Sequence, residues 1–390
     1  MRFCRSILFG AMLLQPLSCF AAGSEPAMPS NLAVDVAVPT SPTPVKASGA
    51  FHAVYELRLI SFSSHQLHLR EVDVTAISGT ESLARYEGQN LIDALGQPVA
   101  PADPADKRAI GAGMSVIVYL DVKANSREAI PSALSHRLVF EPVQGLTEAD
   151  TTISDIRVAV KPQAPIVLEP PLRGGGWIAS HAWSNTSEHR RSMVFVNGKA
   201  WIAQRFAIDW IRIGPNGQAF QGDPAKNRNW APYGAEFLAV AAGRVSDVKD
   251  GIAENDPTSD TKAVPINLET AGGNYIILDL GGGRYAFYAH LQPASLRVRI
   301  GDRVRPGQVI ARLGDSDNAD APHLHFQIMD ANAPLAADGL PYVFRKFRVE
   351  GTLPSLRILA DGEGWRPVAA PVDIRANELP TENEVIDFTP

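Results

Sequence analysis

Apolar and polar residues alternate along the chain from residue 49 to about residue 165, and clusters of Gly, Pro, Asn and Asp separate the runs. The alternating apolar positions are Tyr55, Leu57, Leu59, Leu67, Leu69, Val72, Val74, Val116, Val118, Leu120, Leu138, Phe140, Ile156, Val158 and Val160. A period of two places apolar side chains on one face of a strand. The pattern predicts an antiparallel β-sandwich over residues 49–165.

Four histidines fall in this segment without the grouping of a metal site beyond one close pair. They are His52, His65, His68 and His136. We interpret them as surface residues or as histidines whose hydrogen bonds are satisfied within the domain.

A Pro- and Gly-rich stretch, Pro162 to Gly176, follows the sandwich and is typical of an interdomain connection. Beyond it the chain keeps short strand-like runs to about Arg345, with almost no helical periodicity. We therefore predict an all-β protein in which a β-sandwich-like domain precedes a second β-sheet domain over residues 166–345. The remaining tail, residues 346–390, has acidic and proline residues with weak strand signals, and we assign it no chemistry.

The amino terminus combines the basic residues Arg2 and Arg5 with an apolar run from Ile7 to Leu14 and small residues near Ala21. This order predicts a cleaved signal peptide over residues 1–22. An anchoring helix is the alternative, but the run is shorter than the roughly 20 residues that span a bilayer. A lipoprotein cysteine at Cys19 ranks lower still, because Pro16 and Leu17 before it fit that signal poorly. A flexible leader over residues 23–48 is expected next.

Export changes how the cysteines are interpreted. Both cysteines, Cys4 and Cys19, lie within the predicted signal, so the mature chain has no thiol and no disulfide. The expected location is the periplasm or the cell surface. A net charge of -6 and a pI of about 5.9 offer no basic field, which excludes nucleic acid as a partner.

The second domain contains two histidines separated by one leucine, in the stretch PHLHFQ from Pro322 to Gln327. Residues two apart on a strand face the same way, so His323 and His325 form a pair of imidazoles on one face. Upstream glycines at 301, 307 and 314 indicate tight turns between short strands. Such turns also occur in biotinyl and lipoyl carrier domains, but no lysine for their modification occurs from Gly272 to Ile328.

With these motifs in view, the chain resembles the lysostaphin-like zinc metallopeptidases, which cut peptide cross-links of bacterial cell walls and have the duplicated hybrid motif fold. The resemblance runs from roughly Ala203 to Met329 and is strongest over YAHL, GDRVRPGQ and PHLHF. It implies zinc as the cofactor, peptidoglycan peptides or other extracytoplasmic peptides as partners, and a metallopeptidase domain over residues 166–345.

The resemblance also implies roles for individual residues. It makes His325 and Asp209 zinc ligands, and it makes His290 and His323 the catalytic pair. The family's first motif, His-x-x-x-Asp, has lost its histidine here, because position 205 is arginine. A guanidinium is always protonated and cannot coordinate a cation. We expect Arg205 to point at the site beside Asp209, since alternate strand residues share a face.

A substitute ligand is needed because a catalytic zinc usually has three protein ligands. Asn197 and Gly198 predict a two-residue hairpin turn. With a one-residue bulge, the strand before that turn would bring His189 onto the ligand side. We therefore predict His189 as the third ligand, and His181 is the weaker candidate.

Two functions remain open at this stage. The first is an exported zinc metalloendopeptidase that hydrolyses peptide bonds in peptidoglycan cross-links or stem peptides. The second is a catalytically degenerate relative that binds wall peptides or activates another wall hydrolase. Retention of Asp209, His290, His323 and His325 favours the first, and the missing first-motif histidine favours the second.

Overall fold

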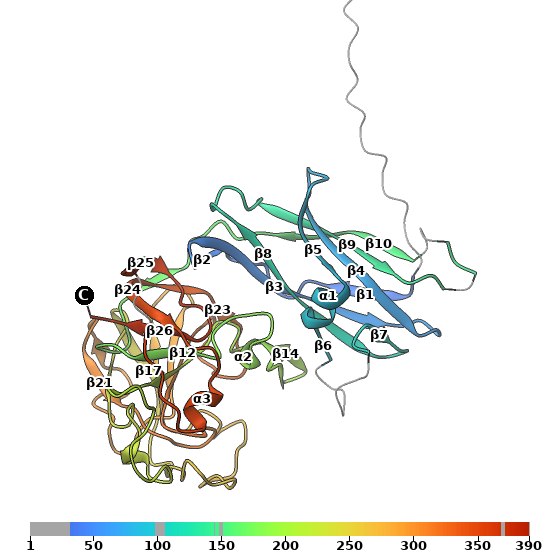
Figure 1. The fold of residues 1–390 in the computed structure, drawn as a ribbon. Helices are drawn as coiled ribbons and strands as arrows, with labels where there is room; N and C mark the ends of the chain where they lie inside the picture. The colour runs from blue at the N-terminus through green and yellow to red at the C-terminus, as the bar shows by residue number, and fades with distance from the viewer. Residues whose placement is uncertain (1–31, 98–105, 144, 148–150, 368–370, 390) are drawn as a thin grey trace, which may run out of the picture.

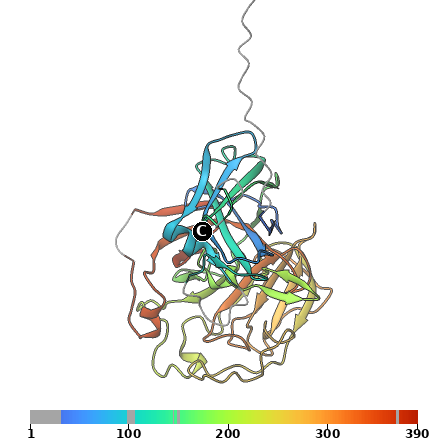
Figure 2. The ribbon, with the colours of Figure 1, turned by 90° about the vertical axis from the view of Figure 1, so that its right-hand side faces the viewer.

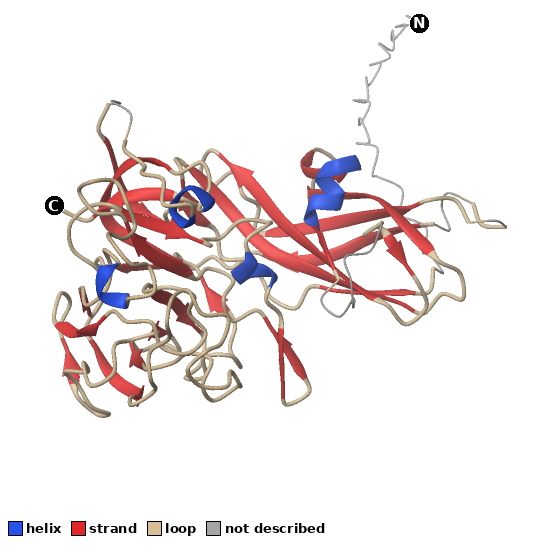
Figure 3. Cartoon of the chain, turned by 60° about the horizontal axis from the view of Figure 1, so that its bottom comes forward, coloured by secondary structure: helices blue, strands red, loops and turns tan. Residues whose placement is uncertain are grey.

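The structure, a computed structural model, describes residues 32–97, 106–143, 145–147, 151–367 and 371–389. The predicted signal peptide, and residues 23–31 of the predicted leader, lie outside the described residues. Strands dominate and the helices are few and short, which confirms an all-β protein (Figure 3).

The amino-terminal domain is a sandwich of two sheets (Figure 1). One sheet has the order β1-β3-β8-β6 with β2 attached to β3, and the other has the order β10-β9-β4-β5 with β7 attached to β4. The strands of the first sheet are β1 (Val34–Ala37), β2 (Val45–Ala47), β3 (Ala50–Ser61), β6 (Leu95–Gly96) and β8 (Ser115–Ala124). Those of the second are β4 (Leu67–Ala76), β5 (Ser82–Glu87), β7 (Ala109–Ile110), β9 (Ala133–Phe140) and β10 (Thr152–Ala159).

The alternation in the sequence forms the core of this sandwich. Tyr55, Leu57 and Leu59 on β3 face Val72 and Val74 on β4 across one buried cluster. The histidines expected to be satisfied include His136, which is buried between the Tyr55 hydroxyl and the Ile156 carbonyl. None of the four is part of the site described below.

The prediction of a flexible leader is wrong for residues 32–48. Strands β1 and β2 both lie within the predicted leader, and both pair with β3. Val45 and Ala47 are fully buried, and they pack into the core of the second domain. Strands β1 and β2 are only four and three residues long, too short to show a clear period among prolines.

The second domain is built on one large sheet with the order β11-β24-β26-β12-β15-β22-β19-β18-β17-β20, to which β23 and β25 attach. Its strands are β11 (Ile166–Leu168), β12 (Trp177–Ser180), β15 (Ile208–Arg212), β17 (Gly243–Lys249), β18 (Tyr275–Asp279), β19 (Tyr285–Ala289), β20 (Arg303–Val304), β22 (Leu324–Met329), β23 (Gly339–Leu340), β24 (Tyr342–Thr352), β25 (Asp373–Glu378) and β26 (Glu384–Asp387). The aromatic side chains Trp210, Phe326 and Phe344 are fully buried in its core.

Short elements decorate this sheet. Two small two-stranded sheets pair β13 (Val194–Val196) with β14 (Lys199–Trp201) and β16 (Glu236–Leu238) with β21 (Val309–Arg312). The helices are α1 (Gly88–Ala94) in the sandwich, and α2 (Glu188–Arg191), the 3-10 turn η1 (Asn227–Asn229) and α3 (Arg357–Ala360) in the second domain. Within the described ranges, no helix has the length and apolar character needed to cross a bilayer.

The carboxy-terminal tail belongs to the large sheet. The boundary predicted at residue 345 falls inside β24, and β25 and β26 both pair with that strand. Strand β26 also pairs with β12, so the end of the chain stands between β24 and the strand next to β15. The tail therefore completes the sheet that carries the site.

The sandwich lies directly against the second domain (Figure 2). Ile117 and Tyr119 on β8 form a small buried cluster with Ile202, and Met193 packs against it. A second contact joins Lys46 on β2 to Glu378 on β25, 2.9 Å apart. The first of these contacts lies beside α2, which carries one of the predicted ligands.

Candidate metal centre

Three neighbouring strands at the centre of the large sheet position the site. Strand β22 lies between β15 and β19, and its register sets Asp209 opposite His325 and His325 opposite Ala289. His290 follows directly after β19, with a φ of 62° that turns the chain out of the sheet. Leu324 and Phe326 are fully buried on the other face, as the alternation predicts.

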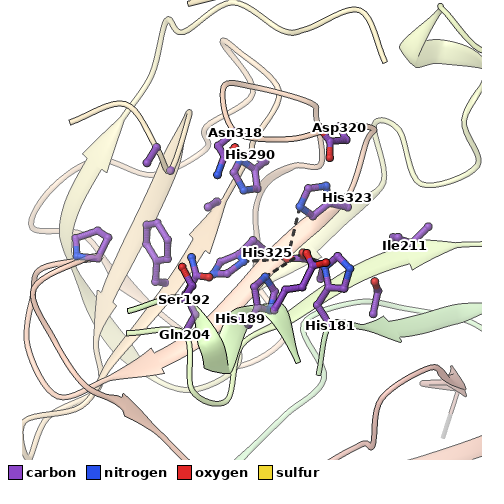
Figure 4. A pocket seen from close by; sticks show the side chains of 18 of the residues that line it. His181, His189, Ser192, Gln204, Ile211, His290, Asn318, Asp320, His323 and His325 are labelled. Carbon is purple, nitrogen blue, oxygen red and sulfur yellow. Dashed lines mark hydrogen bonds and ion pairs between the residues drawn. The ribbon is translucent and has the colours of Figure 1, made fainter. Parts of the chain in front are cut away.

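Four imidazole nitrogens surround the carboxylate of Asp209 (Figure 4). Oδ1 lies 2.9 Å from His325 Nδ1 and 3.5 Å from His323 Nε2. Oδ2 lies 3.1 Å from His189 Nε2 and 3.3 Å from His181 Nδ1. His189, His323 and His325 are each no more than 12% exposed at the side chain, whereas His181 is 34% exposed.

The hydrogen bonds of His325 fix which of its nitrogens is protonated. Its Nε2 lies 2.9 Å from Gln327 Oε1, and the Gln327 amide nitrogen in turn donates to the Pro334 carbonyl. A carbonyl oxygen only accepts, so Nε2 donates and the neutral ring has its lone pair on Nδ1. That lone pair faces Asp209 Oδ1 at 2.9 Å. Two lone pairs at this distance require a proton or a cation between them.

The donor set fits a zinc ion. Neutral imidazole nitrogens and a carboxylate are ligands that zinc prefers, and a second hydrogen bond that fixes the tautomer is usual for such histidines. Ligand atoms at about 2.0–2.2 Å from a tetrahedral ion lie roughly 3.3–3.6 Å apart. The contacts of Asp209 with its imidazoles, from 2.9 to 3.5 Å, are close to that spacing.

One group of three possible metal donors in the described part of the chain is His181, His189 and Asp209, whose ligand atoms all lie within 4.8 Å of one another. This group shares His189 and Asp209 with the ligands predicted from sequence, and it has His181 where the prediction has His325. His325 approaches the other oxygen of the same carboxylate. His189 and Asp209 are therefore common to both possible sets.

His290 and His323 form a second pair beside this carboxylate. Their ring centroids are 4.8 Å apart. His290 Nδ1 donates to the Ser316 carbonyl at 2.9 Å, and His323 Nδ1 donates to the Ala321 carbonyl at 2.8 Å. In the neutral state both rings therefore have their lone pair on Nε2. The backbone of Gly314 lies close to the segment that follows His290. A Cβ at position 314 would lie 2.4 Å from the Gln292 backbone nitrogen, so glycine is needed for this close approach.

The charges of the site follow from burial and from the neighbouring groups. Burial lowers the pKa of His290 well below its usual value, and His323 and His325 lower it further. Burial also lowers the pKa of His323, although Asp209 opposes this. Burial alone would raise the pKa of Asp209, but the surrounding imidazoles outweigh it and hold that pKa well below the usual range. His290 is therefore neutral and Asp209 is ionised near pH 7.

His189 reaches the site by a different route from the one predicted. The hairpin at Asn197 and Gly198 forms, with Val196 opposite Lys199, but it spans only β13 and β14. His189 lies before it, in the helical turn α2, and is not on a bulged strand. The residue predicted from the ligand requirement is thus brought to Asp209, but the strand geometry used to predict it is wrong.

The expectation for Arg205 is also wrong. Strand β15 begins only at Ile208, so Arg205 does not share a strand face with Asp209. Its Nε donates to Glu56 of the sandwich at 3.0 Å, and its Nη2 donates to Asp338 at 3.2 Å. The charge that would oppose a metal is therefore directed into the domain interface.

Sequence reasoning missed the Gln327 side chain and underrated His181. Gln327 directly follows the PHLHF motif and shares the face of His323 and His325, so the period of two was a signal for it. His181 follows β12 in an unusual backbone conformation, with a φ of 50°, for which the sequence has no signal. The pKa of His181 is raised, chiefly by its hydrogen bond to Asp209.

The histidines open onto a pocket of about 500 Å³. Polar side chains from Ser192, Gln204 and Asn318 line it together with the apolar Trp230 and Leu335. Figure 4 shows His181 and His189 on one side of the pocket, with His290 and His323 on the other. A segment of extended substrate placed between them would meet both groups of imidazoles.

The family match includes some of the residues of this site and not others. Residues 230–337 match Peptidase family M23, a segment that contains His290, His323 and His325 but neither His189 nor Asp209. A glycyl-glycine endopeptidase from Staphylococcus capitis is 29% identical over 141 residues, which are 35% of this chain and 36% of the relative. A peptidoglycan DD-endopeptidase from Vibrio cholerae is 25% identical over 125 residues, 32% of this chain and 26% of the relative. The chain spans about a third or less of the length of these relatives.

Solved structures similar to this chain include the following two. The catalytic domain of lysostaphin from Staphylococcus simulans is 20% identical, covers 43% of this chain and 88% of its own, and has a TM-score of 0.23. A zinc containing peptidase from Vibrio cholerae is 14% identical, covers 74% of this chain and 82% of its own, and has a TM-score of 0.26. From the family match and the curated relatives, this chain carries a peptidase family M23 domain.

Proposed function

We propose that the chain is an exported zinc metalloendopeptidase that hydrolyses peptide bonds in peptidoglycan, in its cross-links or stem peptides. The zinc ligands in this proposal are His189, Asp209 and His325. One observation carries it: the lone pair of His325 Nδ1, fixed by Gln327, faces an ionised carboxylate at 2.9 Å. A buried arrangement of this kind is stable when a cation lies among the donors.

A zinc ion bound there would polarise the scissile carbonyl and lower the pKa of a bound water. The chain's own residues would transfer the protons. Burial lowers the pKa of both His290 and His323, and their Nδ1 hydrogen bonds leave the lone pair of each neutral ring on Nε2. Either imidazole can take the proton of the attacking water as a general base, and the resulting imidazolium can donate to the oxyanion or to the leaving amine.

The substrate class rests on the relatives and on the pocket. The names of the relatives describe a glycyl-glycine endopeptidase and a peptidoglycan DD-endopeptidase, both of which act on peptide bonds. The pocket has polar side chains that can bind a peptide backbone, next to apolar side chains such as Trp230. The signal peptide predicted from sequence agrees with a substrate outside the cytoplasm.

Zinc content and digestion of purified peptidoglycan test this proposal together. Wild type is expected to hold one zinc per chain and to release peptides with new amino termini, detected by mass spectrometry. His325→Ala is expected to lose both the zinc and the release. The matched control is His65→Ala, which removes an exposed histidine of the sandwich and should change neither.

A wild type that is loaded with zinc, binds the wall and yet releases no peptide would favour the second function, a wall-binding or hydrolase-activating protein. A wild type that binds no zinc would overturn the proposed metal centre itself.

A further inference from the structure

The ligand His189 stands on a segment that has little structure of its own. Helix α2 is four residues long, and a helix of this length is not stable by itself in water. Ligand histidines are usually oriented by a hydrogen bond from their second nitrogen. Among the described residues, no such partner exists for His189 Nδ1, which is buried. The position of His189 therefore depends on what holds the rest of α2.

The adjacent residue, Arg190, ties α2 to the sandwich domain. Its side chain is fully buried, and its Nε donates to Glu56 Oε1 at 3.0 Å. Its Nη2 donates to the backbone carbonyls of Tyr55 at 2.8 Å and Leu120 at 2.9 Å. All three acceptors belong to strands β3 and β8 of the sandwich. The guanidinium thus fixes the backbone next to His189 through groups of another domain.

Glu56 joins this contact to the other side of the site. It is only 3% exposed, and its second oxygen, Oε2, accepts from Arg205 Nε at 3.0 Å. Arg205 lies three residues before β15, the strand that carries Asp209. One carboxylate of the sandwich therefore bridges two buried guanidiniums, one beside His189 and the other before Asp209. Arg205 also pairs with Asp338.

Glu56 thus links helix α2 to the segment before β15, because it accepts from both Arg190 and Arg205. His189, the residue before Arg190, has its Nε2 3.1 Å from Asp209 Oδ2. Removal of the Glu56 charge would leave two buried guanidiniums without their shared partner, and buried charges of this kind move toward water when they can.

We propose that Glu56 is a positioning residue for the metal ligand His189, so that the sandwich domain completes the metal centre of the peptidase domain. This inference rests on the proposed function, because it requires His189 to be a zinc ligand. Glu56 does not touch the metal or the substrate. It acts through Arg190 and the backbone of α2.

The test measures the zinc dissociation constant of the full chain by competition with a chromogenic chelator. Glu56→Gln keeps the size of the side chain and removes its charge. We expect its zinc affinity to fall about 10–100-fold, as for the loss of other groups that orient a metal ligand. The control is Glu71→Gln, which removes the carboxylate of another sandwich ion pair, with Arg137, and should leave the affinity within about twofold.

A double variant separates positioning from general damage to the fold. If Glu56 acts through His189, then Glu56→Gln in a His189→Ala background should lower zinc affinity no further than His189→Ala alone. If Glu56→Gln does not fold, Arg190→Lys takes its place. Lysine keeps the charge but loses the forked contacts to Tyr55 and Leu120, so the same non-additive loss of zinc affinity is expected.

The outcomes are distinct. Wild-type zinc affinity in Glu56→Gln, or a loss that adds fully to that of His189→Ala, overturns the positioning role while leaving the proposed function intact. Wild-type zinc affinity in His189→Ala, or a wild type that binds no zinc, overturns the ligand assignment and the inference with it.

Discussion

Asp209 on β15 lies directly opposite His325 on β22, and the 2.9 Å between Oδ1 and Nδ1 is the shortest contact of the carboxylate with an imidazole. The pairing register of two central strands sets this contact, so it does not depend on flexible loops. Residues 116 positions apart in the chain thereby form one half of the site. The other half, with His189 and His181, comes from the segment between β12 and β13.

Substitution of His189 tests whether this residue is a direct zinc ligand, as both possible ligand sets require. His189→Ala is expected to weaken zinc binding by more than about 100-fold, because a direct ligand contributes more than the 10–100-fold effect of an outer-shell group. His181→Ala is the matched comparison and should retain most of the affinity, since its ring is the most exposed of the four. Chelator competition measures both. The reverse order would assign the ligand to His181.

Gln327 should matter for zinc although it is not a ligand. Gln327→Ala removes the acceptor that fixes the tautomer of His325, so zinc affinity should fall about 10–100-fold. Gln327→Glu should retain affinity, because a carboxylate accepts the same hydrogen bond. Gln89→Ala, an exposed change in the sandwich, is the control. Equal zinc binding by all three variants would argue against the proposed tautomer.

The catalytic histidines should separate metal binding from turnover. His323→Ala is expected to retain zinc while kcat for peptide release falls by roughly 10²–10⁴-fold, the usual contribution of a general base. His290→Ala should behave in the same direction. Zinc analysis and peptide release on the same samples provide the measurement. Loss of zinc in His323→Ala would show that it is a ligand.

A buried aspartate outside the metal centre gives a pH-dependent prediction. Burial raises the pKa of Asp315 to about 8, while an unfolded-state aspartate titrates near 3.9. Between these values the folded chain retains a proton that the unfolded chain releases, so rising pH lowers the free energy of unfolding. Asp315→Asn removes this dependence.

The gain in stability of Asp315→Asn over wild type should therefore be small at pH 4 and increase steadily toward pH 8, by at most about 1.4 kcal/mol per pH unit. Denaturant unfolding at several pH values measures it. Asp35→Asn is the control, because Asp35 is an exposed aspartate on β1, far from Asp315 in the chain. A gain that is constant with pH would show that Asp315 is ionised throughout.

The sequence is informative wherever a pattern repeats. The alternation of apolar residues predicts the sandwich core around Leu57 and Val72, and the spacing of His323 and His325 predicts their common face. Both depend on the period of a strand, which is a local property. The PHLHF and YAHL motifs likewise lie on or next to strands whose register is regular.

The features that the sequence pattern does not predict depend on contacts between residues distant in the chain. Helix α2 is too short to have a period, so nothing local indicates that His189 leaves the hairpin. The direction of Arg205 is determined by Glu56, 149 positions away, and no strand pattern includes that partner. Strands β1 and β2 were missed because three or four residues among prolines resemble a linker.

The proposed metal centre can be observed by X-ray diffraction from crystals of the zinc-loaded chain at the zinc absorption edge. We predict one anomalous peak bonded to His189 Nε2, the Asp209 carboxylate and His325 Nδ1, at about 2.0–2.2 Å from each. A peak bonded to His181 in place of His325 would move the ligand set to the other oxygen of Asp209. A site without any peak, or a peak that His189 does not contact, would contradict this metal centre.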